Sequence, residues 1–231
     1  MYRKFFKRFL DIVLSALALI ALSPILLILI VLGGIMMRGN PFFTQPRPGK
    51  KGKDGQEKIF RLIKLRTMSN ARDKDGKLLP DEQRLNGYGK FLRSTSADEL
   101  PSLVNILMGD LSIVGPRPQL VRDMVFMSAE QRRRHDVTPG LTGLAQVNGR
   151  NNITWEQKFQ YDLQYIDEGI TFWGDVKIIL ATVGKVLKRS DTVREGTASD
   201  MDFGDWLMQE GKVDAREYDN KQTQAKELLG V

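Results

Sequence analysis

The sequence contains no cysteine and one histidine, His135, among its 231 residues. Without cysteine the chain forms neither disulfides nor thiolate metal sites, and one histidine cannot build a histidine-rich metal centre. The P-loop and the Gly-x-Gly-x-x-Gly motif are also absent, so nucleotide binding by those two routes has no support. The composition fits a reducing compartment.

Negative charge is in deficit. The chain has 28 acidic and 35 basic residues, a formal net charge of +7. This balance favours anionic partners, namely phosphates, nucleic acid or an acidic membrane face, and charge alone does not choose among them. The apolar share of 42% and the charged share of 27% are ordinary for a globular chain. We therefore expect one core domain with appendages, or at most two small domains.

Charge is completely missing from one segment, residues 12–37. An unbroken helix of that length would be roughly 39 Å long and could cross the ~30 Å core of a bilayer. Ser23-Pro24 lies near its middle, where proline breaks or kinks a helix and serine can bond a freed carbonyl. Neither half alone would span a membrane.

Positive residues flank this apolar segment on both sides, and such residues mark cytoplasmic flanks. A helix-break-helix hairpin that re-enters the same side satisfies both flanks, whereas a straight span does not. Many spanning helices carry a proline, so the residues alone leave both topologies open. The flanking residues are Arg3, Lys4, Lys7 and Arg8 before the segment, and Arg38, Arg47, Lys50, Lys51 and Lys53 after it.

The remaining sequence predicts short elements. Residues 38–58 are rich in Gly, Pro and Lys and predict a loop. Residues 59–66 predict a strand or a one-sided helix, and residues 69–85 a surface excursion. Helical spacing predicts a helix over 100–107 that stops at Gly109, a helix-like stretch over 119–134, and helices over 154–165 and 175–188.

Asp98-Glu99 is the first candidate for chemistry. Ser96-x-x-Glu99 has the pattern of a capping box, with Asp98 in the first helical turn. A carboxylate at such a helix start also stays ionised beside donors that attract phosphate, and it can attack phosphorus as a nucleophile. The two interpretations are compatible, because a cap can fix the helix while Asp98 points outward.

Basic residues that could bind phosphate are spread along the chain. Arg117 stands between Pro116 and Pro118, which would hold its guanidinium in place for bidentate contact with phosphate oxygens. Arg150 lies in an Asn-Gly-Arg-Asn turn, where side chains and amides can surround an anion. A diphosphate substrate needs such compensation, usually shared with Mg²⁺. The further candidates near the acid pair are Lys64, Arg66 and Arg93.

Two weaker signals have simpler explanations. Asp73 and Asp75 resemble an Asp-x-Asp metal pair, but they lie in a charged loop and are expected at the surface. His135 follows three arginines and is expected to be part of a basic face.

A set of motifs resembles the bacterial sugar transferase family of monotopic phosphoglycosyl transferases, in the family's order over about residues 3–190. They are Lys7-Arg8-x-x-Asp11, Ser23-Pro24, Phe43-Thr-Gln-x-Arg47-Pro-Gly49, Lys64-x-Arg66-Thr-Met68, Arg93-x-x-Ser96-x-Asp98-Glu99-Leu-Pro101, Asn105-x-Leu-x-Gly-Asp110, Val114-Gly-Pro-Arg-Pro118, Pro139-Gly-x-Thr-Gly143, Gln146-Val-Asn-Gly-Arg150 and Tyr161-Asp162. Among subgroups the chain is similar to the small single-domain enzymes that start glycoconjugate pathways.

The resemblance implies a mostly helical α/β fold of three parts. Residues 1–38 would form a re-entrant membrane hairpin with its bend at Ser23 and Pro24 and both ends cytoplasmic. Residues 39–197 would form the catalytic domain, with short strands and amphipathic interfacial helices. Residues 198–231 would be a C-terminal extension without an assigned role. The protein would then lie on the cytoplasmic face of the bacterial inner membrane, in contact with its lipids.

The resemblance also implies a reaction. Asp98 would attack the β-phosphorus of a UDP-sugar, release UMP and keep the phospho-sugar as a covalent intermediate, which undecaprenyl phosphate or another polyprenyl phosphate would accept. Asp98 and Glu99 would hold Mg²⁺, and Glu99 could handle protons. The implied substrate- and phosphate-binding residues are Lys64, Arg66, Arg93, Arg117, Thr142, Gln146, Arg150 and Asp162.

Two other functions remain open at the level of sequence. The first is a membrane-anchored module that binds anionic lipid or nucleic acid without chemistry, although the resemblance implies no nucleic-acid partner. The second is a glycosyltransferase that moves sugar without phosphate and releases UDP. The sequence leaves the donor sugar, the pathway and the oligomeric state undetermined.

Overall fold

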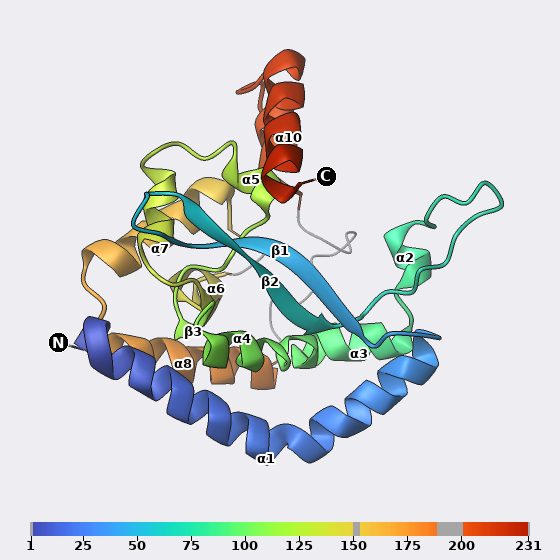
Figure 1. Ribbon diagram of the computed structural model, residues 1–231, viewed down its shortest axis with the longest axis horizontal. Helices are drawn as coiled ribbons and strands as arrows, with labels where there is room; N and C mark the ends of the chain where they lie inside the picture. The colour runs from blue at the N-terminus through green and yellow to red at the C-terminus, as the bar shows by residue number, and fades with distance from the viewer. Residues whose placement is uncertain (1, 150–152, 189–200, 231) are drawn as a thin grey trace.

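A computed structural model describes residues 2–149, 153–188 and 201–230. Helices dominate it, with two two-stranded sheets among them (Figure 1). The first part of the chain contains η1 (Tyr2–Phe6), α1 (Lys7–Met36), β1 (Phe42–Lys51), β2 (Glu57–Leu65), α2 (Asp81–Arg84), α3 (Gly87–Thr95), η2 (Ala97–Glu99) and α4 (Ser102–Met108). The second part contains β3 (Ser112–Val114), α5 (Val121–Met124), η3 (Gln131–Asp136), β4 (Gly140–Thr142), α6 (Leu144–Val147), α7 (Trp155–Asp167), α8 (Phe172–Lys188), α9 (Phe203–Gln209) and α10 (Ala215–Leu229).

The apolar segment forms a single helix, α1, which bends near its middle (Figure 1). Pro24 lies inside it and cannot donate to the carbonyl of Ile20 four residues earlier. The Ser23 hydroxyl donates to that same carbonyl at 2.8 Å. The predicted serine–proline break therefore has its expected local chemistry, within a helix that continues through the bend.

The N-terminal arm of α1 is attached to the rest of the protein by polar contacts. Arg8 donates to the carbonyl oxygens of Ile106 and Leu107 at the end of α4, the second at 2.8 Å. The buried Asp11 carboxylate accepts a hydrogen bond from the Ile113 amide at 2.9 Å. These contacts fix the arm against α4 and β3.

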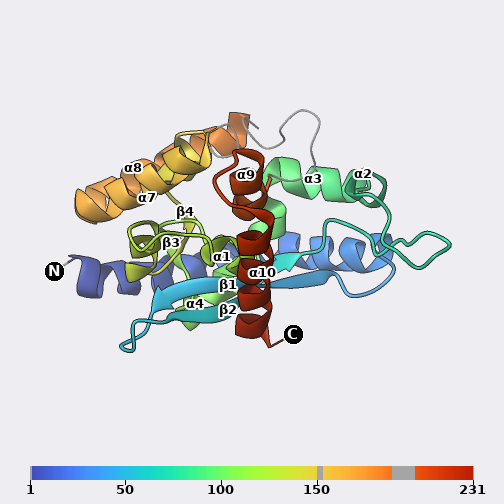
Figure 2. The ribbon, with the colours of Figure 1, turned by 90° about the horizontal axis from the view of Figure 1, so that it is seen from above.

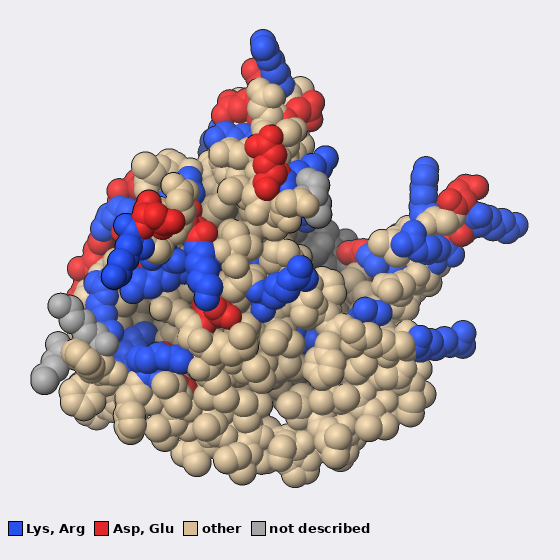
Figure 3. Space-filling model, in the orientation of Figure 1, with Lys and Arg blue, Asp and Glu red and all other residues tan. Residues whose placement is uncertain are grey.

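The C-terminal arm packs on the same body. Leu29 and Met37 belong to a buried cluster with Leu65, Tyr88 and Leu92, and the Tyr88 hydroxyl donates to the Leu29 carbonyl at 2.7 Å. The outer side of α1 remains exposed and apolar, and charged side chains are nearly absent from this face (Figure 3). By length and composition alone, α1 is long and apolar enough to cross a membrane.

β1 and β2 form a twisted antiparallel hairpin above α3 and α4 (Figure 1). The expectation of a loop over residues 38–58 was wrong, because residues 42–51 form β1. Pro46 and Pro48 lie inside that strand, opposite Arg61 and Ile59. A two-stranded sheet has a free edge on each strand, so prolines that lack an N–H are tolerated there. Of the two alternatives for residues 59–66, the structure has the strand, which forms β2.

The short parallel pair β3–β4 depends on glycine. A Cβ on Gly140 would lie 2.1 Å from the Gly115 amide nitrogen, and one on Gly143 would lie 2.2 Å from the Gly115 carbonyl oxygen. Only residues without a side chain allow these backbones to cross so closely. The crossing fixes the start of the Pro116–Pro118 loop.

Some of the helical predictions were confirmed and one was wrong in extent. The helices over 154–165 and 175–188 are confirmed as α7 and α8, and α4 ends at Gly109 with a φ of 94°. The helix-like stretch over 119–134 was wrong in extent, because the chain forms only α5 and the 3₁₀ turn η3 there. Residues 201–230 form α9 and α10, for which the sequence had given no assignment. The expected boundary between residues 197 and 198 lies outside the described residues.

His135 is not part of a basic face, so that expectation was wrong. Its side chain is 3% exposed, and its Nδ1 lies 3.1 Å from Glu57 on β2. Arg132 binds the same carboxylate through Nε at 2.9 Å. Burial lowers the pKa of His135 to about 4. Although burial opposes it, hydrogen bonds from His135 and Arg132 lower the pKa of Glu57 to about 2.

Stability should therefore fall with acidification. An unfolded histidine takes up its proton near pH 6.5, whereas folded His135 does so near pH 4. The contribution of the neutral buried ring to the free energy of unfolding is therefore complete above pH 6.5 and is lost as the pH falls toward 4. The loss should be on the order of 3 kcal/mol. Unfolding in lipid nanodiscs between pH 7 and 4 measures it. His135→Gln is the control, since it does not titrate; an equal slope in that variant would contradict the assignment.

Candidate active site

A cleft of about 930 Å³ lies at the meeting point of β1, β2, η2, α5, α7 and α9. It collects residues that are far apart in the sequence. Eight of the expected site residues line it: Lys64, Arg66, Arg93, Asp98, Glu99, Arg117, Gln146 and Asp162. The fold therefore brings the acid pair and most of the expected phosphate binders together.

The acid pair sits in the single 3₁₀ turn η2, between α3 and α4. Ser96 precedes it in the left-handed conformation, with a φ of 56°, and this conformation ends α3. The Ser96 side chain makes no capping hydrogen bond, so the expected capping box was wrong. The turn instead places Asp98 and Glu99, both half-buried, on the wall of the cleft.

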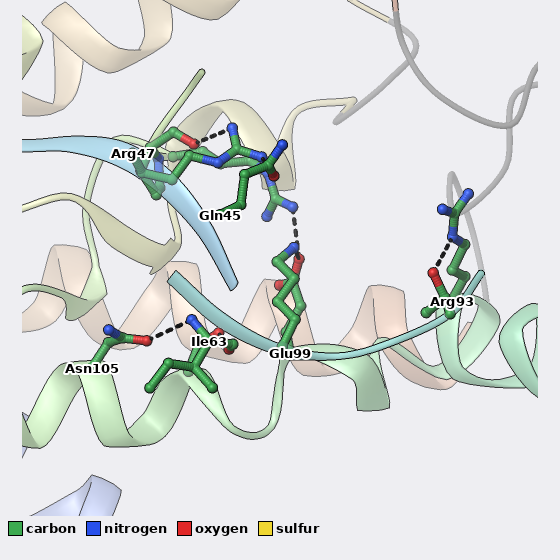
Figure 4. Close-up of polar contacts among 11 residues, drawn as sticks. Gln45, Arg47, Ile63, Arg93, Glu99 and Asn105 are labelled. Atoms are coloured by element: carbon green, nitrogen blue, oxygen red, sulfur yellow. Dashed lines mark hydrogen bonds and ion pairs between the residues drawn. The ribbon is translucent and has the colours of Figure 1, made fainter. Parts of the chain in front are cut away.

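Glu99 joins two cations from different parts of the chain. Its Oε1 accepts from Lys64 Nζ of β2 at 2.8 Å and from Arg117 Nη2 of the Pro116–Pro118 loop at 2.7 Å (Figure 4). The pKa of Lys64 lies below its ordinary value, mainly because the ammonium group is buried. The nearby Glu99 opposes this shift, and Arg117 adds to it. Glu99 thus holds two positive groups side by side, next to Asp98.

Arg47 of β1 is a site residue that we did not select from the sequence. Its guanidinium lines the cleft and donates to the Pro118 carbonyl at 3.0 Å and to Gln45 at 2.6 Å (Figure 4). Burial first, and Arg117 second, lower its pKa to about 10. The sequence did hold a signal, because Pro46-Arg47-Pro48 repeats the Pro-Arg-Pro arrangement around Arg117.

Arg93 marks another part of the cleft. It lies in the last turn of α3, on the opposite side of Glu99 from Arg47 (Figure 4). Its Nε donates to the Thr67 hydroxyl at 3.2 Å and its Nη2 contacts the Met68 sulfur at 3.1 Å. The positive groups therefore surround the acid pair from two directions.

Asp162 of α7 forms a buried ion pair with Arg134, with 2.6 Å between the atoms and both side chains at most 2% exposed. Burial raises the pKa of Asp162, against the effect of Arg134. Arg134 also donates to the Arg117 carbonyl at 2.6 Å, so this pair fixes the loop that carries Arg117.

The other expected residues have different outcomes. Thr142 does not belong to the lining of the cleft among the described residues: it is buried on β4 and its hydroxyl lies 2.7 Å from that of Thr182. Arg150 lies outside the described residues. Asp73 and Asp75 are exposed, as expected.

Comparison with known proteins identifies the family. A sequence model of the bacterial sugar transferases matches residues 2–189, the segment that includes α1 and nearly all of the cleft. The chain belongs to the bacterial sugar transferase family.

Individual relatives agree with this assignment. EpsL of Bacillus subtilis, named as an uncharacterised sugar transferase, is 46% identical over 78% of this chain and 87% of its own length. A UDP-glucose:undecaprenyl-phosphate glucose-1-phosphate transferase of Klebsiella pneumoniae is 42% identical over 78% of this chain, and an undecaprenyl-phosphate galactose phosphotransferase of Salmonella typhimurium 34% over 80%. The match spans only 40% and 41% of the length of those two proteins.

The side chains of the sugar transferase site can be compared with the ligands that magnesium prefers. Within the described ranges, no three His, Cys, Asp or Glu side chains gather as a metal site. Magnesium in phosphoryl-transfer sites is commonly held by one or two carboxylates together with substrate phosphates and water. The adjacent Asp98 and Glu99 on the wall of the cleft fit that role, although Glu99 is already bound by two cations.

The buried Arg134–Asp162 pair should have a characteristic mutational signature in this sugar transferase. Arg134→Met should lower the free energy of unfolding by about 3–5 kcal/mol, because it leaves a buried carboxylate without its partner. The double variant Arg134→Met with Asp162→Leu should recover most of that loss. Chemical denaturation in detergent micelles measures both; a double variant no more stable than the single one would show that the pair does not carry the effect.

Proposed function

We propose that this sugar transferase moves a sugar-1-phosphate from a UDP-sugar to undecaprenyl phosphate or a similar polyprenyl phosphate, and releases UMP. The names of the relatives from Klebsiella and Salmonella describe this class of reaction. The observation that carries the proposal is the cleft itself, where Asp98 lies beside a carboxylate bound to two cations. It is the environment that a nucleophile needs in order to approach an anionic diphosphate.

The proposed reaction has two steps on one phosphorus. A carboxylate oxygen of Asp98 attacks the β-phosphorus of the donor, the bond to the bridging oxygen breaks, and UMP leaves with that oxygen. The acyl phosphate then carries the sugar on Asp98. An oxygen of the lipid phosphate attacks the same phosphorus, which releases the carboxylate and yields the sugar–diphosphate lipid.

The cations would serve both steps. Lys64 and Arg117 bind Glu99, and Arg47 and Arg93 lie on opposite sides of Glu99 (Figure 4), so a diphosphate in the cleft would meet positive charge from more than one direction. Arg66 lines the same cleft. Magnesium held by Asp98 and Glu99 would supply further compensation for the phosphate charge.

The membrane arrangement follows from the two attachments of α1. A straight span would carry one end of the helix about 30 Å away from the other, across the bilayer. In this structure Asp11 and Leu29, near opposite ends of α1, both contact the same body. This supports a re-entrant helix with both ends on the cytoplasmic face of the inner membrane, which would place the cleft near the lipid phosphates.

The nucleophile can be trapped directly. Incubation with a UDP-sugar labelled in its sugar, without lipid acceptor, should leave the label on Asp98, detectable by peptide mass spectrometry. Asp98→Asn should form no adduct and should release UMP at least about a thousandfold more slowly. The matched control is Asp75→Asn, an exposed carboxylate outside the cleft that should behave as wild type.

Three results would contradict this proposal. Wild-type rates of UMP release from folded Asp98→Asn would remove the nucleophile assignment. Release of UDP in place of UMP would indicate transfer of sugar without phosphate. A folded chain that binds lipid but consumes no UDP-sugar would favour the binding-module alternative.

The topology can be tested by single cysteines, since the chain has none of its own. Arg3→Cys is on an exposed residue, and Gly39→Cys has no atom within 4 Å of the added Cβ. Both should react with a membrane-impermeant maleimide from the cytoplasmic side only. Lys53→Cys in the exposed β1–β2 turn reports the side of the catalytic domain; labelling of residue 3 from the opposite side would establish a spanning helix.

A further inference from the structure

The C-terminal helices α9 and α10 lie beyond the segment matched by the family, which ends at residue 189. They follow one another across the middle of the molecule (Figure 2). Three residues of this part, Met201, Asp202 and Asp205, line the same cleft as the acid pair. The tail therefore contributes a wall to the site.

That wall is firmly attached. The Phe203 amide donates to the buried Asp123 carboxylate at 2.9 Å, and the Phe203 ring packs against Trp155 and Phe159 of α7 with centroids 5.1 Å apart in both cases. The Trp155 indole donates to the Met201 carbonyl at 3.2 Å. These contacts hold the start of α9 against α7 and α5.

α10 in turn supports α9. The Tyr218 hydroxyl of α10 donates to Asp205 Oδ1 at 2.5 Å, and the Tyr218 ring packs against Phe126. Ala225 is buried against Val121 and Val125 at α5. α10 is thus attached both to α9, through Asp205, and to the body of the protein, through α5.

The α9 side of the cleft has a different chemistry from the side around Glu99. Asp202 and Asp205 add carboxylates there, and Arg122 pairs with Asp202. Asp162, which is 2% exposed and lines the cleft, has no hydrogen-bond partner for its Oδ1, and the buried amide oxygen and nitrogen of Gln146 also have none. Burying such groups without partners is costly, so they mark a place where a ligand completes the hydrogen bonds.

The chemistry of that ligand follows from the groups. Carboxylates accept hydrogen bonds from hydroxyl and N–H groups and repel phosphate, while a glutamine amide both donates and accepts. We propose that the α9 side of the cleft binds the uncharged, hydroxyl- or amide-bearing part of the donor, with Asp205, Asp162 and Gln146 as its hydrogen-bond partners. This rests on the proposed function, which places the donor diphosphate among the cations on the other side. Two parts of a UDP-sugar have this chemistry, the hexose and the uridine.

The test separates these two sources. With the donor that the wild type consumes, chosen from UDP-glucose and UDP-galactose, Asp205→Asn should raise KM about tenfold and leave kcat nearly unchanged, because it weakens a charge-assisted hydrogen bond made throughout the reaction. If the hexose is bound there, the inhibition constant of UMP should not change. If the uridine is bound there, that constant should rise together with KM.

Tyr218→Phe is the matched control. It removes the hydrogen bond to Asp205 but keeps the carboxylate, so KM should stay within about twofold of wild type. Gln146→Leu, on another element of the same wall, should raise the same constants as Asp205→Asn.

Specific results would overturn the inference. An unchanged KM and UMP inhibition constant in folded Asp205→Asn would show that the wall does not touch the donor. An equal rise in KM for Tyr218→Phe would show that Asp205 acts only through the docking of α10. A wild-type enzyme that consumes no UDP-sugar would instead remove the proposed function, so the two failures are distinguishable.

Discussion

One carboxylate, Glu99, brings together three separate parts of the chain. It lies on a one-turn helix, and its partners Lys64 and Arg117 come from a strand and from a proline-bounded loop. Two cations placed so close together in a largely buried setting would repel each other and lose hydration without an anion between them. Glu99 compensates both costs, so the positive side of the cleft depends on it.

Contacts outside the cleft fix the positions of the segments that meet at Glu99. The buried Arg134–Asp162 pair and the glycine crossing of β3 and β4 hold the backbone on either side of Arg117. On the opposite side, Ser96 adopts a left-handed conformation that is uncommon for residues other than glycine, and this aims the acid pair at the cleft. The acid pair and Arg117 thus lie on short irregular segments, while Lys64 and Arg47 lie on the strands of the long hairpin.

Much of this arrangement could be predicted from local sequence, but its exceptions have physical reasons. Helical spacing was enough for α7 and α8, and Gly109 correctly marked the end of α4. Proline and glycine content suggested a loop where β1 forms, because sequence does not reveal that a strand has a free edge for its prolines. The capping pattern at Ser96 failed because Ser96 is left-handed and makes no side-chain cap, and the Glu99 carboxylate is bound to Lys64 and Arg117.

The site residues show the same division. Motif resemblance pointed to eight residues that the fold brings to the cleft, yet it included Thr142, which the fold turns into a buried neighbour of α8. Arg47 was missed although its Pro-Arg-Pro context matches that of Arg117. Asp205 was missed because its place in the cleft depends on contacts between distant elements, which have no signature in a single sequence.

The exposed outer side of α1 has a consequence for how the protein is made. A long helix whose apolar residues face away from the body exposes a large hydrophobic surface, which promotes association in water. A newly synthesised chain that completed its polar body before reaching lipid would expose this surface to every neighbour and aggregate. In the proposed re-entrant arrangement, entry of α1 into the bilayer while the rest of the chain is being synthesised would keep this apolar surface out of water.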